Sequence, residues 1–299
     1  MILVVVVPPE EEGRRLESIV GDGLAAHLGR PVPRSVVRRI VMAGAVRLQG
    51  RPLRRPGLPM QPGRRIEIAL DPRRLDARER DTPFTLTARE VLFRDACLLA
   101  VAKPPGLSSV PTADPSRPSL VRAVEEWLST LGESTYLGVH QRLDRGTSGV
   151  VLFARDERAN AGLAAAFQAH RVEKTYAALT SRPRRAVPDR FEVDLPVGGK
   201  PAQTRFSVVE RLPGGLRVEA CPRTGRKHQV RVHLAEAGIP ILGDTRYGGA
   251  AAAPRPMLHA ARLSLLHPVS GAPLGIECPL PADFRTALMT LGERASRRR

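Results

Sequence analysis

The chain has 299 residues, of which 42% are hydrophobic and 26% charged, a composition typical of a globular protein with room for more than one domain. Its net charge of +17 comes from 47 basic and 30 acidic residues and favours a polyanionic partner, above all nucleic acid. A bias of the genome toward arginine explains why lysines are few, but not why acids are few. The three cysteines are widely spaced and form no Cys-x-x-Cys pair, which argues against a disulfide framework and a zinc site.

The apolar runs of the sequence are all shorter than a membrane-spanning helix. Residues 1–7 are apolar but lack the basic region that opens a signal peptide, so we predict a strand there. We therefore expect a cytoplasmic protein with no membrane partner.

Residues 23–66 contain ten arginines and no acidic residue. Apolar residues at positions 36, 37, 40 and 41 follow helical spacing, with most of the nearby arginines off that face. Gly44 is predicted to end this helix, and residues 46–48 and 66–69 are predicted strands. A basic helix on a small β-element is typical of an RNA-docking surface, although a basic helix can also be only a solvated face. The candidate RNA-binding residues are Arg34, Arg38, Arg39 and Arg47.

The next stretch, residues 71–88, has no sustained apolar periodicity and begins with a dense run of charges. We predict a basic N-terminal RNA-binding module over residues 1–75, a linker over residues 76–88 and a second domain over residues 89–299.

The second domain mixes short apolar strands with helices. We expect an α+β fold, with a mixed, largely antiparallel β-sheet flanked by helices, preceded by the small α/β module. A phosphate-binding glycine loop and a dinucleotide fingerprint are both missing from the sequence, which disfavours an ATP or NAD enzyme. The predicted strands are residues 91–93, 98–102, 150–154, 172–179, 191–195, 204–210 and 216–220, and the predicted helices are residues 120–131, 227–237 and one that Asp156 caps and that runs to residue 169.

Asp144 lies in a polar loop that leads into the apolar run at residues 150–154, and it is flanked by Arg142 and Arg145. Neighbouring positive charge favours the ionised carboxylate, so Asp144 is a candidate nucleophile or base. An aspartate between arginines is also commonly a surface ion pair or a loop cap. These residues by themselves leave both interpretations open.

The segment Arg-Leu-Asp-Arg-Gly-Thr-Ser-Gly at residues 142–149 resembles the catalytic motif of the RluA-type pseudouridine synthases. That family has a histidine directly before the first arginine, whereas Gln141 intervenes here, so the displaced His140 is left out of the site. Residues 35–50 resemble the RNA-binding module named after ribosomal small-subunit protein four. Further segments resemble the family's motifs in the family's order: Lys-Thr-Tyr at residues 174–176, Lys-Pro-Ala-Gln-Thr at residues 200–204, Thr-Gly-Arg-Lys-His-Gln-Val-Arg-Val-His at residues 224–233, Pro-Ile-Leu-Gly-Asp at residues 240–244 and Leu-His-Ala at residues 258–260.

The resemblance implies an RNA pseudouridine synthase, an isomerase that flips a uridine out of its stack and needs no cofactor. It implies that Asp144 acts at the ribose, either by attacking C1′ or by abstracting a sugar proton, that Arg231 pairs with Asp144, and that Tyr176 packs on the base. Contacts to the substrate are expected from Arg142, Arg226, His228 and Gln229.

The basic module favours large-subunit ribosomal RNA over transfer RNA as the partner, and we expect a monomer. Three alternatives are a transfer-RNA pseudouridine synthase, a catalytically silent RNA-binding or assembly protein, and a glycosidase. The presence of Asp144, Tyr176 and Arg231 together argues against the silent protein, and a glycosidase needs a second positioned acid that does not stand out. His228 and His233 are five residues apart without a completing ligand, so no metal site is predicted.

Overall fold

The chain divides into two compact units, residues Met1–Thr82 and Pro83–Arg299. The computed structural model describes residues 2–42, 44–69, 84–112, 117–183 and 185–293, and only the backbone of Ser35 and Arg39. The linker predicted over residues 76–88 lies mostly outside the described residues. Within the described part of the chain, every helix is too short or too polar to cross a membrane.

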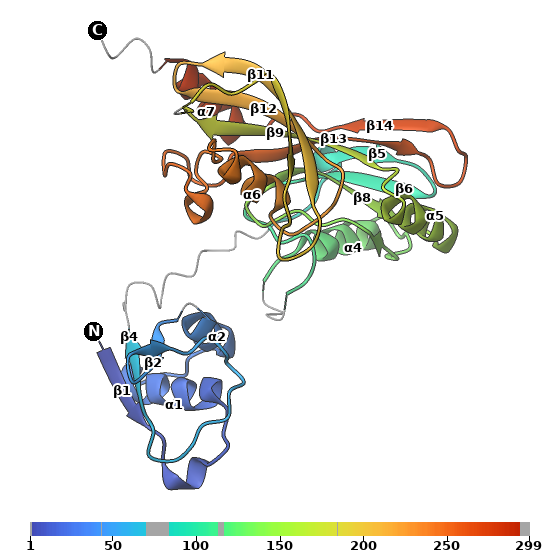
Figure 1. Ribbon diagram of the computed structural model, residues 1–299. Coiled ribbons are helices and arrows are strands. Elements are labelled where there is room, and N and C mark those ends of the chain that lie inside the picture. Colours follow the sequence, from blue (N-terminus) through green and yellow to red (C-terminus); the bar gives the residue numbers. More distant parts are fainter. Residues whose placement is uncertain (1, 43, 70–83, 113–116, 184, 294–299) are drawn as a thin grey trace. The chain divides into compact units, whose positions relative to one another are not determined.

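The N-terminal unit packs two helices on a four-stranded antiparallel sheet whose strand order is β1-β4-β2-β3 (Figure 1). Its core contains Leu16, Ile19 and Leu24 from the first helix and Val37 and Val41 from the second. The elements are β1 (Ile2–Val6), η1 (Pro9–Glu11), α1 (Leu16–Leu28), α2 (Arg34–Met42), β2 (Val46–Leu48), β3 (Arg51–Pro52) and β4 (Arg65–Ala69).

The predictions for this unit are confirmed for β1, α2, β2 and β4, whereas α1 was not predicted. Two glycines interrupt the apolar pattern of α1. One of them, Gly23, faces Val5, because a Cβ at Gly23 would lie 2.5 Å from Val5 Cγ2. The close packing of α1 against β1 therefore favours a glycine that weakens the helical pattern in the sequence.

The second unit is built on a ten-stranded mixed sheet with the order β10-β11-β12-β9-β13-β8-β6-β5, to which β14 and β7 add at β13 and β8 (Figure 1). The β13–β8 pair is parallel and the other pairs are antiparallel. This arrangement confirms the predicted mixed, largely antiparallel α+β fold. The strands are β5 (Val91–Arg94), β6 (Leu98–Lys103), β7 (Gly138–Val139), β8 (Ser148–Ala154), β9 (Glu173–Ser181), β10 (Arg190–Asp194), β11 (Gln203–Leu212), β12 (Gly215–Pro222), β13 (Leu258–Leu266) and β14 (Pro273–Glu277).

Among the described residues of this unit, four α-helices cover the sheet in two pairs. In Figure 1, α4 (Leu120–Thr130) and α5 (Glu157–Gln168) lie along the half that contains β5, β6 and β8. The other pair, α6 (Gln229–Glu236) and α7 (Ala282–Glu293), lies at the half that contains β9, β11 and β12. Each pair buries its own hydrophobic cluster, and β13 contributes residues to both. The junction of the two clusters therefore lies at β8, β13 and β9.

Strand β8 is buried at all seven positions, as its continuous apolar run predicts for a central strand. Asp156 caps α5 through Oδ1, which accepts a hydrogen bond of 2.7 Å from the Ala159 amide and confirms the predicted cap. The central position of β8 fixes the loop that precedes it, which contains Asp144.

Candidate active site

The backbone of the loop before β8 is held on several sides. Leu143 exchanges two hydrogen bonds of 2.9 Å with the Ser109 hydroxyl. The Asp144 carbonyl accepts from the Thr147 amide at 2.9 Å, and the Arg145 carbonyl accepts from the Gly106 amide at 2.8 Å. Because the loop is bonded both within itself and to the segment that contains Gly106 and Ser109, the backbone that carries the Asp144 side chain is fixed.

The Asp144 carboxylate faces two side chains from α6 and the residue before it. Its Oδ2 lies 3.2 Å from Nη1 of Arg231, and its Oδ1 lies 3.5 Å from Nε2 of His228. The Asp144 side chain is 26% exposed. The carboxylate is therefore paired and still reachable by a substrate.

Arg231 serves two carboxylates at once. Its Nε and Nη2 donate to Asp244 Oδ2 and Oδ1 at 2.6 and 2.8 Å, and the third nitrogen is the one that faces Asp144. Although burial opposes the charge, the hydrogen bond to Asp244 and the negative charges of both carboxylates raise the pKa of Arg231. Arg231 is thus a fixed cation, aimed at Asp144 by a bidentate pair behind it.

Tyr247, which ends the short helix η3 (Thr245–Tyr247), contacts both partners of Asp144. Its hydroxyl lies 2.8 Å from Nδ1 of His228, and the Arg231 guanidinium lies 5.1 Å from the centre of its ring. Burial lowers the pKa of His228, and the positive charges of Arg231 and Arg246 act in the same direction, against the opposing effect of Asp144.

Tyr176 is placed by β9, where it pairs with Ala220 of β12 and Ala260 of β13. It packs against both hydrophobic clusters. Burial and the Asp144 charge raise the pKa of Tyr176 to about 12, so its phenol is protonated at neutral pH. Ala260, the partner of Tyr176 on β13, also pairs with Gly149 of β8, so β9 lies one strand away from the strand that follows the Asp144 loop.

Lys103, which the sequence did not single out for the site, lies fully buried beneath the Asp144 loop. Its Nζ donates to the carbonyls of Pro104, Leu107 and Arg145 at 2.9, 2.7 and 3.3 Å. Burial lowers the pKa of Lys103 to about 7, with a further lowering from Arg255 and Arg145.

The four predicted substrate contacts lie in different environments. Arg142 is exposed beside Asp144, and His228 contacts Asp144 directly. Arg226 donates through Nε to the Pro201 carbonyl at 3.0 Å. Gln229 is buried, and its amide is bonded to Thr224, Arg226, Gln203 and Thr204, which holds the start of α6 in place.

The displaced histidine turns away from the site. His140 Nε2 lies 2.6 Å from Asn160 Oδ1 on α5, and Gln141 donates to the Val150 carbonyl at 3.3 Å. His140 was left out of the predicted site, and these contacts give it a partner on α5.

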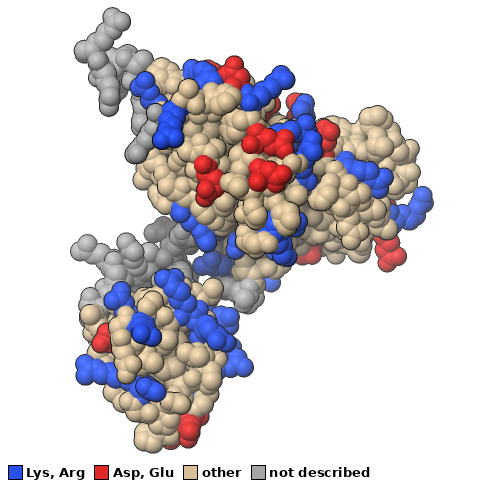
Figure 2. Space-filling view, in the orientation of Figure 1, with Lys and Arg blue, Asp and Glu red and all other residues tan. Residues whose placement is uncertain are grey.

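In the N-terminal unit, one buried carboxylate holds two of the predicted RNA-binding arginines. Glu17, whose side chain is 2% exposed, lies 2.5 Å from Nη2 of Arg34 and 3.3 Å from Nη1 of Arg38. Arg47 is exposed on β2, and the Arg39 side chain lies outside the described residues. Figure 2 shows basic side chains over much of the visible face of this unit and few acidic ones.

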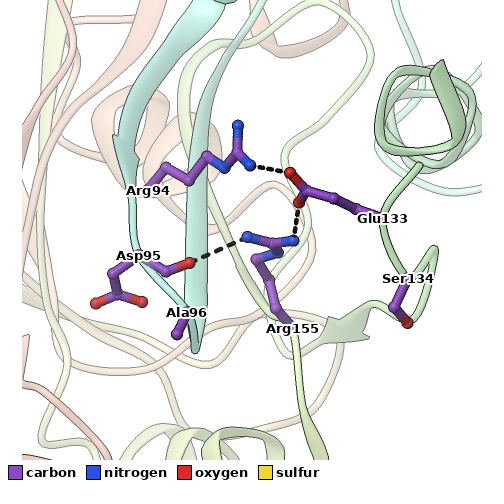
Figure 3. Close-up of a pocket in the computed structure, with 6 residues that line it drawn as sticks. All are labelled: Arg94, Asp95, Ala96, Glu133, Ser134 and Arg155. Atoms are coloured by element: carbon purple, nitrogen blue, oxygen red, sulfur yellow. Dashed lines mark hydrogen bonds and ion pairs between the residues drawn. The ribbon is translucent and has the colours of Figure 1, made fainter. Parts of the chain in front are cut away.

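A surface hollow of about 530 Å³ lies at the end of β8 opposite to Asp144. Figure 3 shows Arg94 and Arg155 both turned toward the Glu133 carboxylate, with Arg155 also donating to the Asp95 carbonyl at 3.1 Å. Both guanidinium groups are engaged within the protein, and none of the predicted site residues lines the hollow. We therefore do not assign the hollow to the chemistry. Among the described residues, no group of three or more His, Cys, Asp or Glu side chains could hold a metal ion.

Comparisons with known proteins show the family of this chain. Residues 97–236 match a family model described as RNA pseudouridylate synthase. An uncharacterized RNA pseudouridine synthase from Chloroflexus aurantiacus is 32% identical, over 98% of this chain and 95% of its own length. The chain belongs to the RluA-type family of RNA pseudouridine synthases. The ribosomal large subunit pseudouridine synthase D of Xylella fastidiosa is 31% identical, over 96% of this synthase and 92% of its own length.

Among solved structures, human RNA pseudouridylate synthase domain containing 4 has a TM-score of 0.57 and 26% identity with this synthase, covering 68% of this chain and 93% of its own. The predicted family and enzyme class are thereby confirmed, and the synthase is an isomerase. The roles of individual residues stay predictions. Asp244, Tyr247 and Lys103 were not predicted as parts of the site. Asp244 is the last residue of one of the segments that resemble the family, and Tyr247 follows it by three residues, whereas Lys103 had no such signal.

Proposed function

We propose that this synthase converts specific uridines of large-subunit ribosomal RNA to pseudouridine, with Asp144 as the reacting carboxylate. The observation that carries the proposal is the partly exposed carboxylate of Asp144 held between Arg231 and His228. The name of the Xylella fastidiosa relative supports ribosomal RNA as the substrate. We also propose that the synthase acts as a monomer in the cytoplasm, since one chain supplies Asp144, Arg231 and Tyr176 and a bacterial ribosomal RNA enzyme works where ribosomes are assembled.

In the proposed reaction the bond from ribose C1′ to N1 of uracil breaks and a bond from C1′ to C5 forms. The proton on C5 leaves and N1 gains one, so the reaction is redox-neutral and the product is an isomer. Asp144 either attacks C1′ or abstracts a sugar proton. Arg231 orients the Asp144 carboxylate through its 3.2 Å contact with Oδ2 in both cases.

The target uridine must leave its stack to reach Asp144, at a cost of a few kcal/mol that binding recovers. Tyr176 offers its ring to the extruded base. Because the pKa of Tyr176 is raised to about 12, its oxygen can accept the C5 proton only if it passes on its own proton. Arg142, Arg226, His228 and Gln229 are the proposed substrate-side residues, with Gln229 acting through the loop that its amide holds.

We also propose that residues 1–75 form an RNA-docking module, with residues 76–88 as a linker to a catalytic domain over residues 89–299. Support comes from the exposed Arg47 and from the two arginines that Glu17 holds at the surface. A preorganised pair of guanidinium groups binds phosphates at a lower entropic cost than free side chains do.

The test is to map pseudouridines in total RNA from a strain that lacks this protein, complemented with the intact chain, Asp144→Asn or Asp189→Asn. Asp189 is an exposed aspartate that pairs with an arginine outside the site, and it serves as the matched control. Loss of pseudouridine in large-subunit ribosomal RNA that the intact chain and Asp189→Asn restore, and Asp144→Asn does not, supports the proposal.

Other outcomes contradict separate parts of the proposal. Loss confined to transfer RNA would show that the substrate is wrong and leave the reaction in place. Unchanged modification at every uridine would favour an RNA-binding or assembly protein. Restoration by Asp144→Asn would remove Asp144 from the mechanism.

A further inference from the structure

His228 lies between two groups that can each bond one of its ring nitrogens. Its Nδ1 lies 2.8 Å from the Tyr247 hydroxyl, and its Nε2 lies 3.5 Å from Asp144 Oδ1. Its side chain is 11% exposed, so water does not replace these partners freely. The position of the ring proton therefore decides whether His228 attracts or repels the Asp144 carboxylate.

An ionised carboxylate only accepts hydrogen bonds. If His228 carries its proton on Nε2, the ring N–H faces Asp144, and the lone pair on Nδ1 accepts from the Tyr247 hydroxyl. If the proton is on Nδ1, the lone pair on Nε2 faces a carboxylate oxygen, which is repulsive. In the first arrangement each ring nitrogen of His228 faces a group of complementary character.

The doubly protonated ring is opposed by its surroundings. Besides Asp144 from the loop before β8, the charged groups that act on His228 are Arg231 on α6, Arg246 on η3 and Lys227 beside it. Three of these four charges are positive, and burial also disfavours a cation. The neutral ring with its proton on Nε2 is the form that fits the site.

The backbone conformation of His228 also indicates that the position of its side chain matters. The residue has φ of 61° and ψ of 16°, a left-handed conformation at the residue before α6. Residues other than glycine adopt this backbone conformation at an energetic cost. Only three described residues other than glycine have positive φ, and His228 is the one beside Asp144.

We propose that Tyr247 is a positioning residue that keeps the His228 proton on Nε2, so that His228 donates to Asp144 Oδ1 while Arg231 donates to Oδ2. This inference rests on the proposed function in one respect, namely that Asp144 is the reacting carboxylate. With the Arg231 guanidinium bonded to Oδ2 and the ring N–H of His228 facing Oδ1 at 3.5 Å, rotation of the carboxylate is restricted. Tyr247 also packs its ring against the Arg231 guanidinium, so it contacts both residues that face the Asp144 carboxylate, Arg231 and His228.

The first test is nuclear magnetic resonance of the intact chain labelled with ¹⁵N-histidine, which distinguishes the two neutral tautomers and the cation. His228→Gln identifies the His228 signals among the seven histidines. We expect the Nε2–H tautomer at pH 7 in the wild type and a shift toward the other forms in Tyr247→Phe. A cation or an Nδ1–H ring in the wild type, or an unchanged spectrum in Tyr247→Phe, overturns the inference.

The second test is steady-state pseudouridine formation. Tyr247→Phe is expected to lower kcat about tenfold, the loss typical of a weakened hydrogen bond to a charged group, with KM nearly unchanged. In a His228→Gln background, where the amide N–H replaces the Nε2 donor, Tyr247→Phe should have little further effect. Tyr136→Phe, at an exposed tyrosine, is the matched control and should behave as the wild type.

The two tests separate the two claims. If the wild type is inactive on every RNA, the proposed function fails, while the resonance spectrum still decides the tautomer. If the wild type is active and Tyr247→Phe keeps its full kcat, the positioning role of Tyr247 is wrong and the proposed function stands.

Discussion

Arg231 illustrates why one residue type is needed at one position of the site. It binds Asp244 through two nitrogens and presents a third to Asp144. A lysine has a single nitrogen and cannot form the planar two-point pair with Asp244 while it faces Asp144. The buried Asp244 thus orients the cation that pairs with Asp144, the carboxylate proposed to react.

Lys103 predicts a dependence of stability on pH. Its folded-state pKa is about 7 against 10.5 for an ordinary lysine, so between these values the unfolded chain binds more protons than the folded one. The contribution of Lys103 to the free energy of unfolding therefore rises from about pH 7 to about pH 10.5 and is lost as the pH falls through about 7. Its upper size is a few kcal/mol, since one pKa unit corresponds to about 1.4 kcal/mol.

Chemical denaturation at a series of pH values checks this prediction. Lys103→Met should flatten the rise of the free energy of unfolding between about pH 7 and pH 10, whatever its effect on the absolute value. Lys200→Met, at an exposed lysine, should keep the wild-type slope. Parallel curves for Lys103→Met and the wild type would show that Lys103 is charged throughout this range.

At the scale of single residues, the resemblance to the family predicted Asp144, Tyr176 and Arg231 as site residues, because each lies in a short local motif. The sequence did not predict Asp244, Tyr247 and Lys103 as site residues, and the reason is physical. Their roles depend on segments that meet only after folding, such as η3 beside α6 and the end of β6 beneath the Asp144 loop. An aspartate or lysine in such a segment carries no local sign of its partner.

Among the elements, β8 and β13 form the junction on which the site depends. Gly149 has φ of 125°, and a Cβ there would lie 2.3 Å from the Ala260 carbonyl oxygen of β13. We predict that Gly149→Ala lowers the free energy of unfolding by about 3 kcal/mol or more, because backbone strain and overpacking act together. Denaturant titration measures the change.

The matched control is Gly275→Ala on β14. A Cβ at Gly275 would meet nothing within 4 Å and its φ is not in the left-handed range, so its stability should stay within about 1 kcal/mol of the wild type. Equal losses in the two variants would contradict the close approach at Gly149.

Elements with a clear periodic pattern were predicted from the sequence, whereas less regular ones were not. β8 is a continuous apolar run, α4 is amphipathic, and α5 begins at the cap residue Asp156, and the positions of all three were confirmed. β13, β14 and α7 were not predicted, since polar residues interrupt their apolar pattern and their pairing partners are distant in sequence. The order of the strands in the sheet also depends on such distant pairs.

For the whole molecule, we expect the N-terminal unit to contribute to RNA binding and the second unit to contain the catalytic residues. Deletion of residues 1–75 should weaken RNA binding and flatten its dependence on salt, by about 0.7–0.9 in the logarithmic slope for each phosphate that the module neutralises in the intact chain. Filter binding at several salt concentrations measures both quantities. Replacement of Arg47, Arg51, Arg54 and Arg55 by glutamine in the intact chain should act in the same direction. This variant distinguishes the loss of positive charge from the loss of the whole module. Unchanged affinity and slope in both variants would remove the basis for the module's role.

The reaction proposed for Asp144 is the isomerisation of uridine in ribosomal RNA. The most direct measurement is tritium release from large-subunit ribosomal RNA labelled at C5 of uridine, with the purified intact chain, Asp144→Asn and Asp189→Asn, since the C5 hydrogen leaves when pseudouridine forms. We predict release by the intact chain and Asp189→Asn and a rate about 10³-fold or more lower for Asp144→Asn, with RNA binding retained. Release by Asp144→Asn at the rate of the intact chain would contradict the account.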